Sequence, residues 1–178
     1  MNLKEIIKNK KRLYQGTYLS FEQWEVILPD KSEAVREIVI PHDAVALVPV
    51  DHHRNIHLVR QTRIAVNELL VEIPAGVIEN NESPEETARR ELVEEIGLYP
   101  NTLIQLTSYY HAEGYSTGVM TLFLGMDLEA QPAKRHKPAG EFLEHVIIPF
   151  EEAVNWLNQG LFKDSKSILG ILFAQKWL

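Results

Sequence analysis

The sequence predicts an α/β protein in which strands lie on either side of one well-defined helix. Short alternating or continuous apolar stretches, bounded by Pro, Gly and Asp, are typical of strands and occur both before and after residue 83. A helical period follows that residue, and two further amphipathic segments cover residues 150–159 and 165–178. With 45% apolar residues in 178, the chain has enough apolar surface for a proper core.

Residues 1–42 predict a small antiparallel β extension. The strand-like segments are residues 12–18, 21–28 and 35–40, with a turn at residues 29–32. Pro41-His42-Asp43 then interrupts the apolar pattern. We therefore place a domain boundary here, with a second domain over residues 43–178.

The second domain begins with residues 44–50, an almost continuous apolar run expected of a strand buried on both faces. Further strands are predicted at residues 57–61, 69–73, 103–110, 119–126 and 144–148. Pro74-Ala75-Gly76 predicts a sharp turn. Residues 127–140, which contain two prolines and a basic cluster, predict a long loop, and such loops are usually functional or disordered.

The central helix has clear start and stop signals. Ser83 suits the N-cap, Pro84 the first helical position and Glu86 the third, where it completes a capping box. Gly97 predicts the end of the helix as a left-handed cap. The apolar stripe facing the core is Ala88, Leu92 and Ile96.

Composition excludes several classes of function. The net charge of −7 and pI near 5.5 lack the basic surface of a protein that binds nucleic acid or anionic membranes. The absence of cysteine excludes disulfides, thiolate catalysis and Cys-ligated zinc. There is no apolar run of membrane-spanning length, and the N-terminal residues are charged, so we expect a cytoplasmic protein.

Three carboxylates gather near the end of the central helix. Glu91 and Glu95 stand four residues apart, and like charges at that spacing repel. The negative end of the helix dipole lies at the same place and further destabilises the carboxylates. One interpretation is a solvated face with pairs such as Arg90 and Glu94; the other is a site for Mg²⁺ or Mn²⁺, which prefer carboxylate oxygens.

The spacing of this segment resembles the Nudix box. The matching positions are Gly76, Glu82, Arg90, Glu91, Leu92, Glu94, Glu95, Gly97 and Leu98. The resemblance implies an α/β/α sandwich with a mixed β-sheet. It also implies a hydrolase that cleaves the pyrophosphate of a nucleoside diphosphate linked to another group.

The resemblance also implies roles for individual residues. Glu91, Glu95 and the carbonyl of Ala75 are expected to bind Mg²⁺, with Mn²⁺ as a substitute. Arg90 and Glu94 are expected to assist catalysis, Arg90 by orienting a carboxylate. Glu141, on the long loop, is expected to act as general base, with Glu82 a weaker candidate whose usual role is support.

Residues 61–63 and 70–76 are similar to the approach to the box in the ADP-ribose and nucleotide-sugar pyrophosphatase branch. This similarity implies that Arg63 reaches the phosphates of a nucleotide-sugar substrate. It also implies a homodimer that exchanges N-terminal strands and builds the base site from them. The expected substrate-binding residues are Arg63, Arg36, Glu37, Tyr18 and Gly114.

Several alternatives stay open. Many members carry Ser-Pro-Gly and a nearby Glu where this chain has residues 112–118, so the sugar and base are not fixed. Dinucleoside polyphosphates or an NTP are alternative substrates, and a non-catalytic nucleotide sensor is an alternative role. The N-terminal aromatic residues serve either as stacking platforms or as cross-strand pairs. His52, His53 and His57 form no closed ligand set and are expected to be surface histidines.

Overall fold

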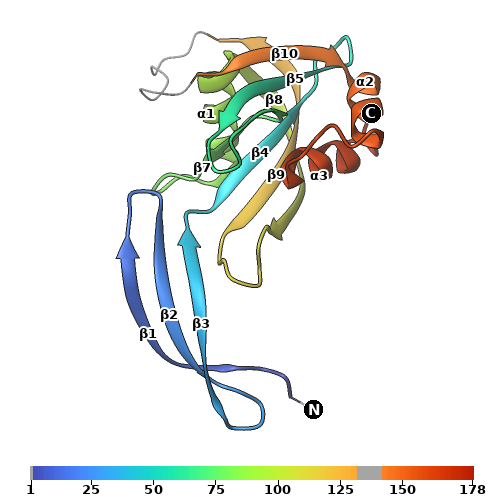
Figure 1. Ribbon diagram of the computed structural model, residues 1–178. Helices are drawn as coiled ribbons and strands as arrows, with labels where there is room; N and C mark the ends of the chain where they lie inside the picture. The colour runs from blue at the N-terminus through green and yellow to red at the C-terminus, as the bar shows by residue number, and fades with distance from the viewer. Residues whose placement is uncertain (1, 132–141) are drawn as a thin grey trace. The chain divides into compact units, whose positions relative to one another are not determined.

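A computed structural model describes residues 2–131 and 142–178 (Figure 1). The chain divides into two compact units. The first takes in the chain up to Asp43 together with Tyr109–Val119. The second takes in Ala44–Ser108 and the described part of Met120–Leu178. None of the described helices is long and apolar enough to cross a membrane.

The first unit is built on an antiparallel sheet in the order β1-β2-β3. Its strands are β1 (Ile6–Gln15), β2 (Leu19–Ile27) and β3 (Glu33–Pro41). The prediction of a first strand at residues 12–18 is wrong in its bounds, because a turn at Gly16, whose N–H donates to the Leu19 carbonyl at 2.9 Å, ends β1 early. The other segment of this unit, Tyr109–Val119, is hydrogen-bonded to β3: the Val39 N–H donates to the Tyr115 carbonyl at 2.8 Å.

The second unit contains two sheets among its described residues, in the orders β7-β4-β9-β8 and β10-β5-β6. The first sheet is mixed, because β4 pairs with β9 in parallel and with β7 in antiparallel fashion. The strands are β4 (Ala44–Pro49), β5 (Asn55–Arg63), β6 (Glu68–Glu72), β7 (Ala75–Val77), β8 (Leu98–Tyr110), β9 (Val119–Ala130) and β10 (Glu144–Pro149).

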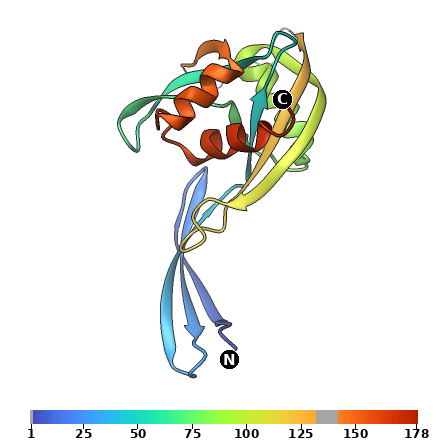
Figure 2. The ribbon, with the colours of Figure 1, turned by 90° about the vertical axis from the view of Figure 1, so that its right-hand side faces the viewer.

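Helices cover both faces of β4. The helices are α1 (Pro84–Ile96), α2 (Phe150–Asn158) and α3 (Ser165–Ala174). Val45 and Leu47 form a buried cluster with Ala88 and Leu92 of α1. Strand residues alternate between faces, and Val48 accordingly contacts α3. Figure 2 shows α2 and α3 together on that second face. The predicted strand buried on both faces is thus confirmed.

Several local predictions for the second unit differ from the structure. Strand β8 begins at Leu98, five residues before the predicted start at 103, and helix α3 ends at Ala174 instead of residue 178. Residues 75–77 form a short strand, since Ala75 pairs with Ala46 of β4, where only a turn was expected. Strand β9 continues to Ala130 instead of giving way to a loop at residue 127. The next residue, Gln131, donates its N–H to the Gly97 carbonyl at 2.9 Å, which keeps this end of the strand beside the start of β8.

Candidate active site

The carboxylate-rich helix α1 is fixed at both ends by its own residues. Ser83 Oγ accepts the Glu86 N–H at 3.2 Å, and Glu86 Oε2 accepts the Ser83 N–H at 2.8 Å. This reciprocal pair is the capping box expected from the sequence. Gly97 ends the helix with φ of 71°, a conformation that costs glycine little. The caps fix where α1 begins and ends, and the packing of Ala88 and Leu92 against β4 fixes which face of the helix lies on the core.

Gly76 makes room for the carboxylate of Glu91. A Cβ atom added at position 76 would lie 1.8 Å from Glu91 Cδ and 2.0 Å from its Oε1, well inside contact distance. The Glu91 side chain therefore lies directly over the backbone of β7. This contact gives a physical reason for glycine at the first position of the spacing pattern.

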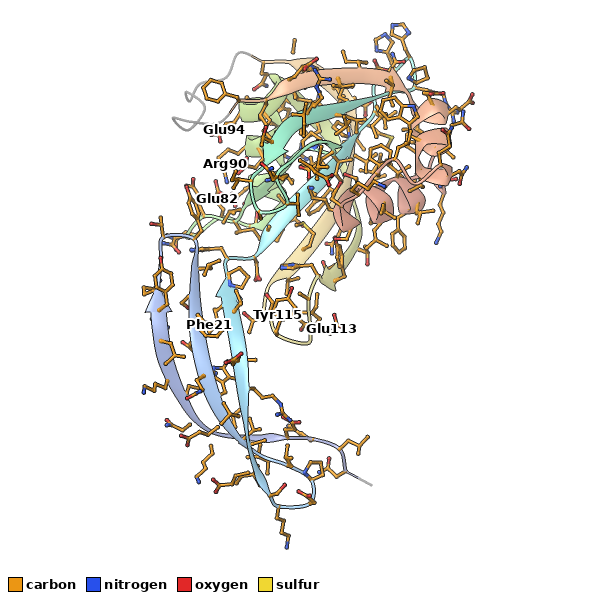
Figure 3. All side chains as sticks on the ribbon, in the orientation of Figure 1. Phe21, Glu82, Arg90, Glu94, Glu113 and Tyr115 are labelled. Carbon is orange, nitrogen blue, oxygen red and sulfur yellow. The ribbon has the colours of Figure 1, made fainter. Side chains whose placement is uncertain are left out.

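Arg90 binds three of the nearby carboxylates. Its Nε and Nη2 donate to the two oxygens of Glu82, each at 2.8 Å, which is a bidentate pair. Its Nη1 donates to Glu91 Oε1 at 2.7 Å and to Glu94 Oε2 at 3.1 Å. Figure 3 labels Arg90 and Glu94 on α1 and Glu82 just before it. The arginine offsets the repulsion that these carboxylates would otherwise exert.

The same network shifts the protonation of its members. The hydrogen bonds from Arg90, with smaller contributions from Thr87 and the Glu79 N–H, lower the pKa of Glu82 to about 2 against the cost of burial. The pKa of Arg90 is raised above its usual value, chiefly by its hydrogen bonds to Glu82 and by the charge of Glu91. Glu82 and Arg90 are therefore both charged throughout the physiological range.

Glu95 and Ala75 are brought together by the turn before β7. The Ala75 N–H donates to Glu95 Oε2 at 3.2 Å, so this carboxylate lies beside the backbone of the turn. Within residues 2–131 and 142–178, no three acidic or histidine side chains already stand at metal-binding distance. The donor set nevertheless fits a hard divalent cation, because it offers only carboxylate and carbonyl oxygens and because Glu91 fills the space left by Gly76.

Comparison with known proteins decides the family. Residues 40–169 match the NUDIX domain. The chain is 32% identical over 174 residues to the ADP-ribose pyrophosphatase of Bacillus subtilis (strain 168), covering 98% of this chain and 94% of the relative. The chain belongs to the Nudix family. The predicted Nudix hydrolase is thereby confirmed, and the family's dependence on a divalent metal applies to it.

One further relative and one solved structure are similar to this Nudix chain. The methanol dehydrogenase activator of Bacillus methanolicus is 27% identical over 164 residues, covering 92% of this chain and 89% of the relative. A solved structure of an ADP compounds hydrolase matches with a TM-score of 0.88 at 23% identity, covering 100% of this chain and 96% of that one. The predicted α/β fold with a mixed sheet and N-terminal antiparallel strands is confirmed.

Arg63 lies at the end of β5 and binds a carboxylate that the sequence analysis missed. Its Nε and Nη2 donate to Glu72 Oε2 at 2.9 and 2.7 Å, and Glu72 is only 1% exposed. Burial alone would lower the pKa of Arg63, but the hydrogen bonds and charge of Glu72 outweigh it, and the charges of Glu95 and Asp164 also raise it. The field of Glu95 thus connects Arg63 electrostatically to the Nudix box. A signal was available, because a lone Glu in an apolar stretch needs a partner when buried.

The remaining predicted substrate residues belong to the first unit. Arg36 donates to both oxygens of Glu5, at 3.1 and 2.6 Å, and Glu37 pairs with Gln23 across the sheet. Tyr18 is 74% exposed. Gly114 has open space where a side chain would extend. Their roles, like that of Glu141, which lies outside the described residues, stay predictions.

One histidine differs from expectation. His57 is not a surface residue but is 7% exposed, and its Nδ1 lies 2.9 Å from His145 Nε2 on the neighbouring strand β10. Its Nε2 faces Asp51 Oδ2 at 3.5 Å. Burial lowers the pKa of His57 despite the opposing effect of Asp51. The pair therefore joins β5 to β10 and forms no part of the Nudix box.

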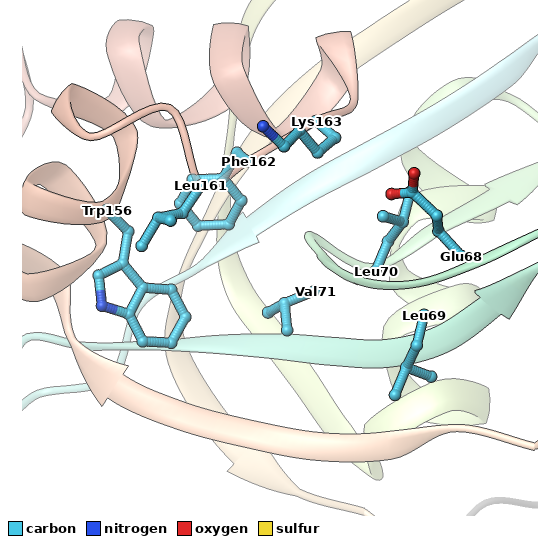
Figure 4. Close-up of a pocket in the computed structure, with 8 residues that line it drawn as sticks. All are labelled: Glu68, Leu69, Leu70, Val71, Trp156, Leu161, Phe162 and Lys163. Atoms are coloured by element: carbon cyan, nitrogen blue, oxygen red, sulfur yellow. The ribbon is translucent and has the colours of Figure 1, made fainter. Parts of the chain in front are cut away.

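A pocket of about 270 Å³ lies elsewhere in the second unit. Figure 4 shows it between β6 and the segment that runs from α2 to α3. Trp156, Leu161 and Phe162 line one side, and residues 68–71 line the other. None of the Nudix box carboxylates lines it, so its apolar walls are not those of the diphosphate site.

Proposed function

We propose that this Nudix hydrolase cleaves the pyrophosphate bond of ADP-ribose or a related nucleoside diphosphate sugar, with Mg²⁺ as cofactor and Mn²⁺ as a substitute. The products are a nucleoside monophosphate and a sugar phosphate. The observation that carries the proposal is the complete carboxylate set of the box: Arg90 binds Glu82, Glu91 and Glu94, Glu91 lies over Gly76, and Glu95 accepts the Ala75 N–H. The relatives named for ADP-ribose support the choice of substrate.

The chain's own residues would bind the metal, orient the carboxylates and place positive charge near the substrate. Glu91, Glu95 and the Ala75 carbonyl would hold the metal, which when bound neutralises phosphate charge and lowers the pKa of water. Arg90 keeps Glu91 and Glu94 oriented. Arg63 would contribute positive charge to the diphosphate.

Glu141 would accept the proton of the attacking water, with Glu94 beside the other carboxylates as an assisting group. The in-line attack needs this base on the side of the phosphorus opposite the leaving group. Charge neutralisation and positioning supply most of the rate enhancement in such transfers.

We propose a homodimer that covers the N-terminal sheet, with Arg36, Glu37 and Tyr18 contacting the base and Gly114 lining the distal half of the ligand. All residues of β1 are exposed in the single chain. Its apolar side chains include Ile6, which is 60% exposed, and Tyr14, at 59%. Isolated small sheets of this kind are marginally stable without further packing. The cytoplasmic location and the lack of nucleic-acid and membrane partners stay predictions.

The test is release of AMP from ADP-ribose by the purified protein. Glu95→Gln keeps the shape of the side chain but removes its charge, so we expect kcat to fall about a hundredfold or more. Glu85→Gln, an exposed glutamate in the first turn of the same helix, is the matched control and should keep wild-type activity.

A panel of nucleotide sugars, dinucleoside polyphosphates and NTPs, each with Mg²⁺ and with Mn²⁺, identifies the preferred substrate. Wild-type inertness toward every nucleotide sugar in that panel would refute the proposal. Activity confined to another compound class would favour the alternative substrates. Binding without turnover would favour a nucleotide sensor.

A further inference from the structure

The buried carboxylate of Glu72 has a second cationic neighbour besides Arg63. Lys166 of α3 places its Nζ 3.3 Å from Glu72 Oε2, the same oxygen that accepts both bonds from Arg63. The Nζ also donates to Asp164 Oδ1 at 2.7 Å. Lys166 is 8% exposed, and a lysine is rarely buried so deeply without a partner. Two acids and two cations therefore share one group, in which Arg63 is the member with a well-exposed side chain.

The first turn of α3 also forms a hydrogen bond with the chain just before Ala75. The Ile73 N–H donates to Ser167 Oγ at 2.9 Å, and this hydroxyl donates in turn to Asp164 Oδ1 at 2.9 Å. On the other side of the turn, the Pro74 carbonyl accepts the Leu47 N–H at 2.9 Å. Helix α3 thus contacts both the strand end that leads to Ala75 and, through Glu72, the guanidinium of Arg63.

The charge balance of this group determines whether the positive charge of Arg63 is available to a substrate. With Lys166 present, Glu72 and Asp164 carry two negative charges against two positive ones. Without Lys166, Arg63 alone would balance two buried carboxylates, and the group would carry a net negative charge. A negative field at this point would oppose the approach of a diphosphate and bind the guanidinium more firmly to Glu72.

We propose that Lys166 is a positioning residue for the hydrolysis, which balances Glu72 so that the charge of Arg63 stays available to the diphosphate of the substrate. Asp164 holds the lysine in place and, through Ser167, ties it to the turn before Ala75. This inference rests on the proposed function, because it requires that Arg63 meets a phosphate.

The test compares steady-state kinetics of Lys166→Met and wild-type protein with ADP-ribose and Mg²⁺. We expect KM to rise about tenfold, within the coupling range of residues in one ion-pair network, while kcat changes less than about threefold. Lys166→Arg should restore KM to within about threefold, because it restores the charge. Lys163→Met, on an exposed lysine shortly before α3, is the matched control and should behave as wild type.

A double-variant cycle separates positioning from a general loss of structure. Arg63→Gln should raise KM strongly in the wild-type background but much less in the Lys166→Met background, since the lysine acts through the arginine. If Lys166→Met does not fold, Lys166→Gln replaces it, because its amide can still donate to Asp164 while the charge is lost. The same rise in KM is expected.

The outcomes are distinguishable. If wild-type protein hydrolyses ADP-ribose and a folded charge-removing variant keeps the wild-type KM, this inference alone is overturned. A fall in kcat at constant KM, not rescued by arginine, would also overturn it, because that pattern indicates a purely structural lysine. If the wild-type protein hydrolyses no nucleotide sugar, the proposed function fails and takes this inference with it.

Discussion

The two units of the chain differ in how much apolar surface their strands bury. In the second unit, Val45 and Leu47 of β4 are completely buried, and α1 and α3 cover the two faces of that strand. In the first unit, every residue of β1 is exposed, and Val26 is the single N-terminal strand residue among the buried apolar side chains of the described chain. The second unit has its own core, whereas the described strands of the first sheet bury little apolar surface of their own.

Charge is also handled differently in the two units. Three of the box carboxylates, Glu82, Glu91 and Glu94, share one arginine that is itself largely buried, so each depends on the others. In the N-terminal sheet, Lys8–Glu33 and Arg36–Glu5 are separate pairs with well-exposed side chains. Exposed pairs contribute little to stability. Substitutions should therefore have larger effects in the box than in the sheet.

Among the variants that compare the two units, the largest effect is expected for Gly76→Ala. The added methyl group would overlap the Glu91 carboxylate, and displacing a catalytic group by about 1 Å typically costs about a hundredfold in rate. We expect kcat/KM for ADP-ribose to fall by about that factor. The dimer should be unaffected, because the change lies in the second unit.

A matched double variant tests the cause. Gly76→Ala combined with Glu91→Ala removes the side chain that the new methyl group meets, so it should recover part of any stability lost, measured as unfolding temperature, without recovering activity. Wild-type activity in Gly76→Ala alone would show that Glu91 does not need its position over β7.

An intermediate effect is expected at the exposed face of β1. Ile6 and Ile7 point to opposite faces of the sheet, so a charge at one or the other shows which face the partner covers. Burying an isoleucine contributes about 1.5–3 kcal/mol. The glutamate variant on the covered face should therefore raise the dimer Kd at least about tenfold, measured by sedimentation.

Ile64→Glu provides the comparison for these variants. This isoleucine is 82% exposed in the turn between β5 and β6 of the second unit, and we expect no change in dimer Kd. If neither Ile6→Glu nor Ile7→Glu weakens association, the exposed residues of β1 are not the dimer surface.

The smallest effect concerns pH. Because burial lowers the pKa of His57 in the folded protein, the unfolded chain, with a histidine pKa near 6.5, binds the proton more readily. Stability should therefore fall as pH drops below about 6.5, by at most about 1.4 kcal/mol per pH unit for one group. Denaturant unfolding between pH 7.5 and 5.5 measures this, and His57→Gln should flatten the dependence relative to His53→Gln.

Sequence reasoning succeeded where the signal is local. The start and end of α1 follow from Ser83, Pro84 and Gly97, whose capping geometry depends only on near neighbours. The carboxylates were found by their spacing along one helix. Glu72, Lys166 and Ser167 were missed, because the contacts that join the end of β6 to α3 link positions 94 residues apart and no periodic pattern marks such contacts.

The bounds of β1 were misplaced for a related reason. A strand exposed on both faces has no apolar alternation to mark where it starts, so the pattern around residues 12–18 reflected the aromatic residues instead of the pairing. Strand β4, which is buried on both faces, was placed within one residue. For these two strands, burial marked the bounds in the sequence and exposure on both faces left them unmarked.

The hydrogen bond between Ile73 and Ser167 joins positions that are 94 residues apart. During translation, a nascent chain that has emerged only as far as α1 already carries Glu72 and the box, but not yet the lysine and hydroxyl that fix them. In ribosome-bound intermediates of that length, Glu72 would lie in an apolar strand without the positive charge of Lys166. The second unit is therefore expected to complete its folding only after α3 has been synthesised.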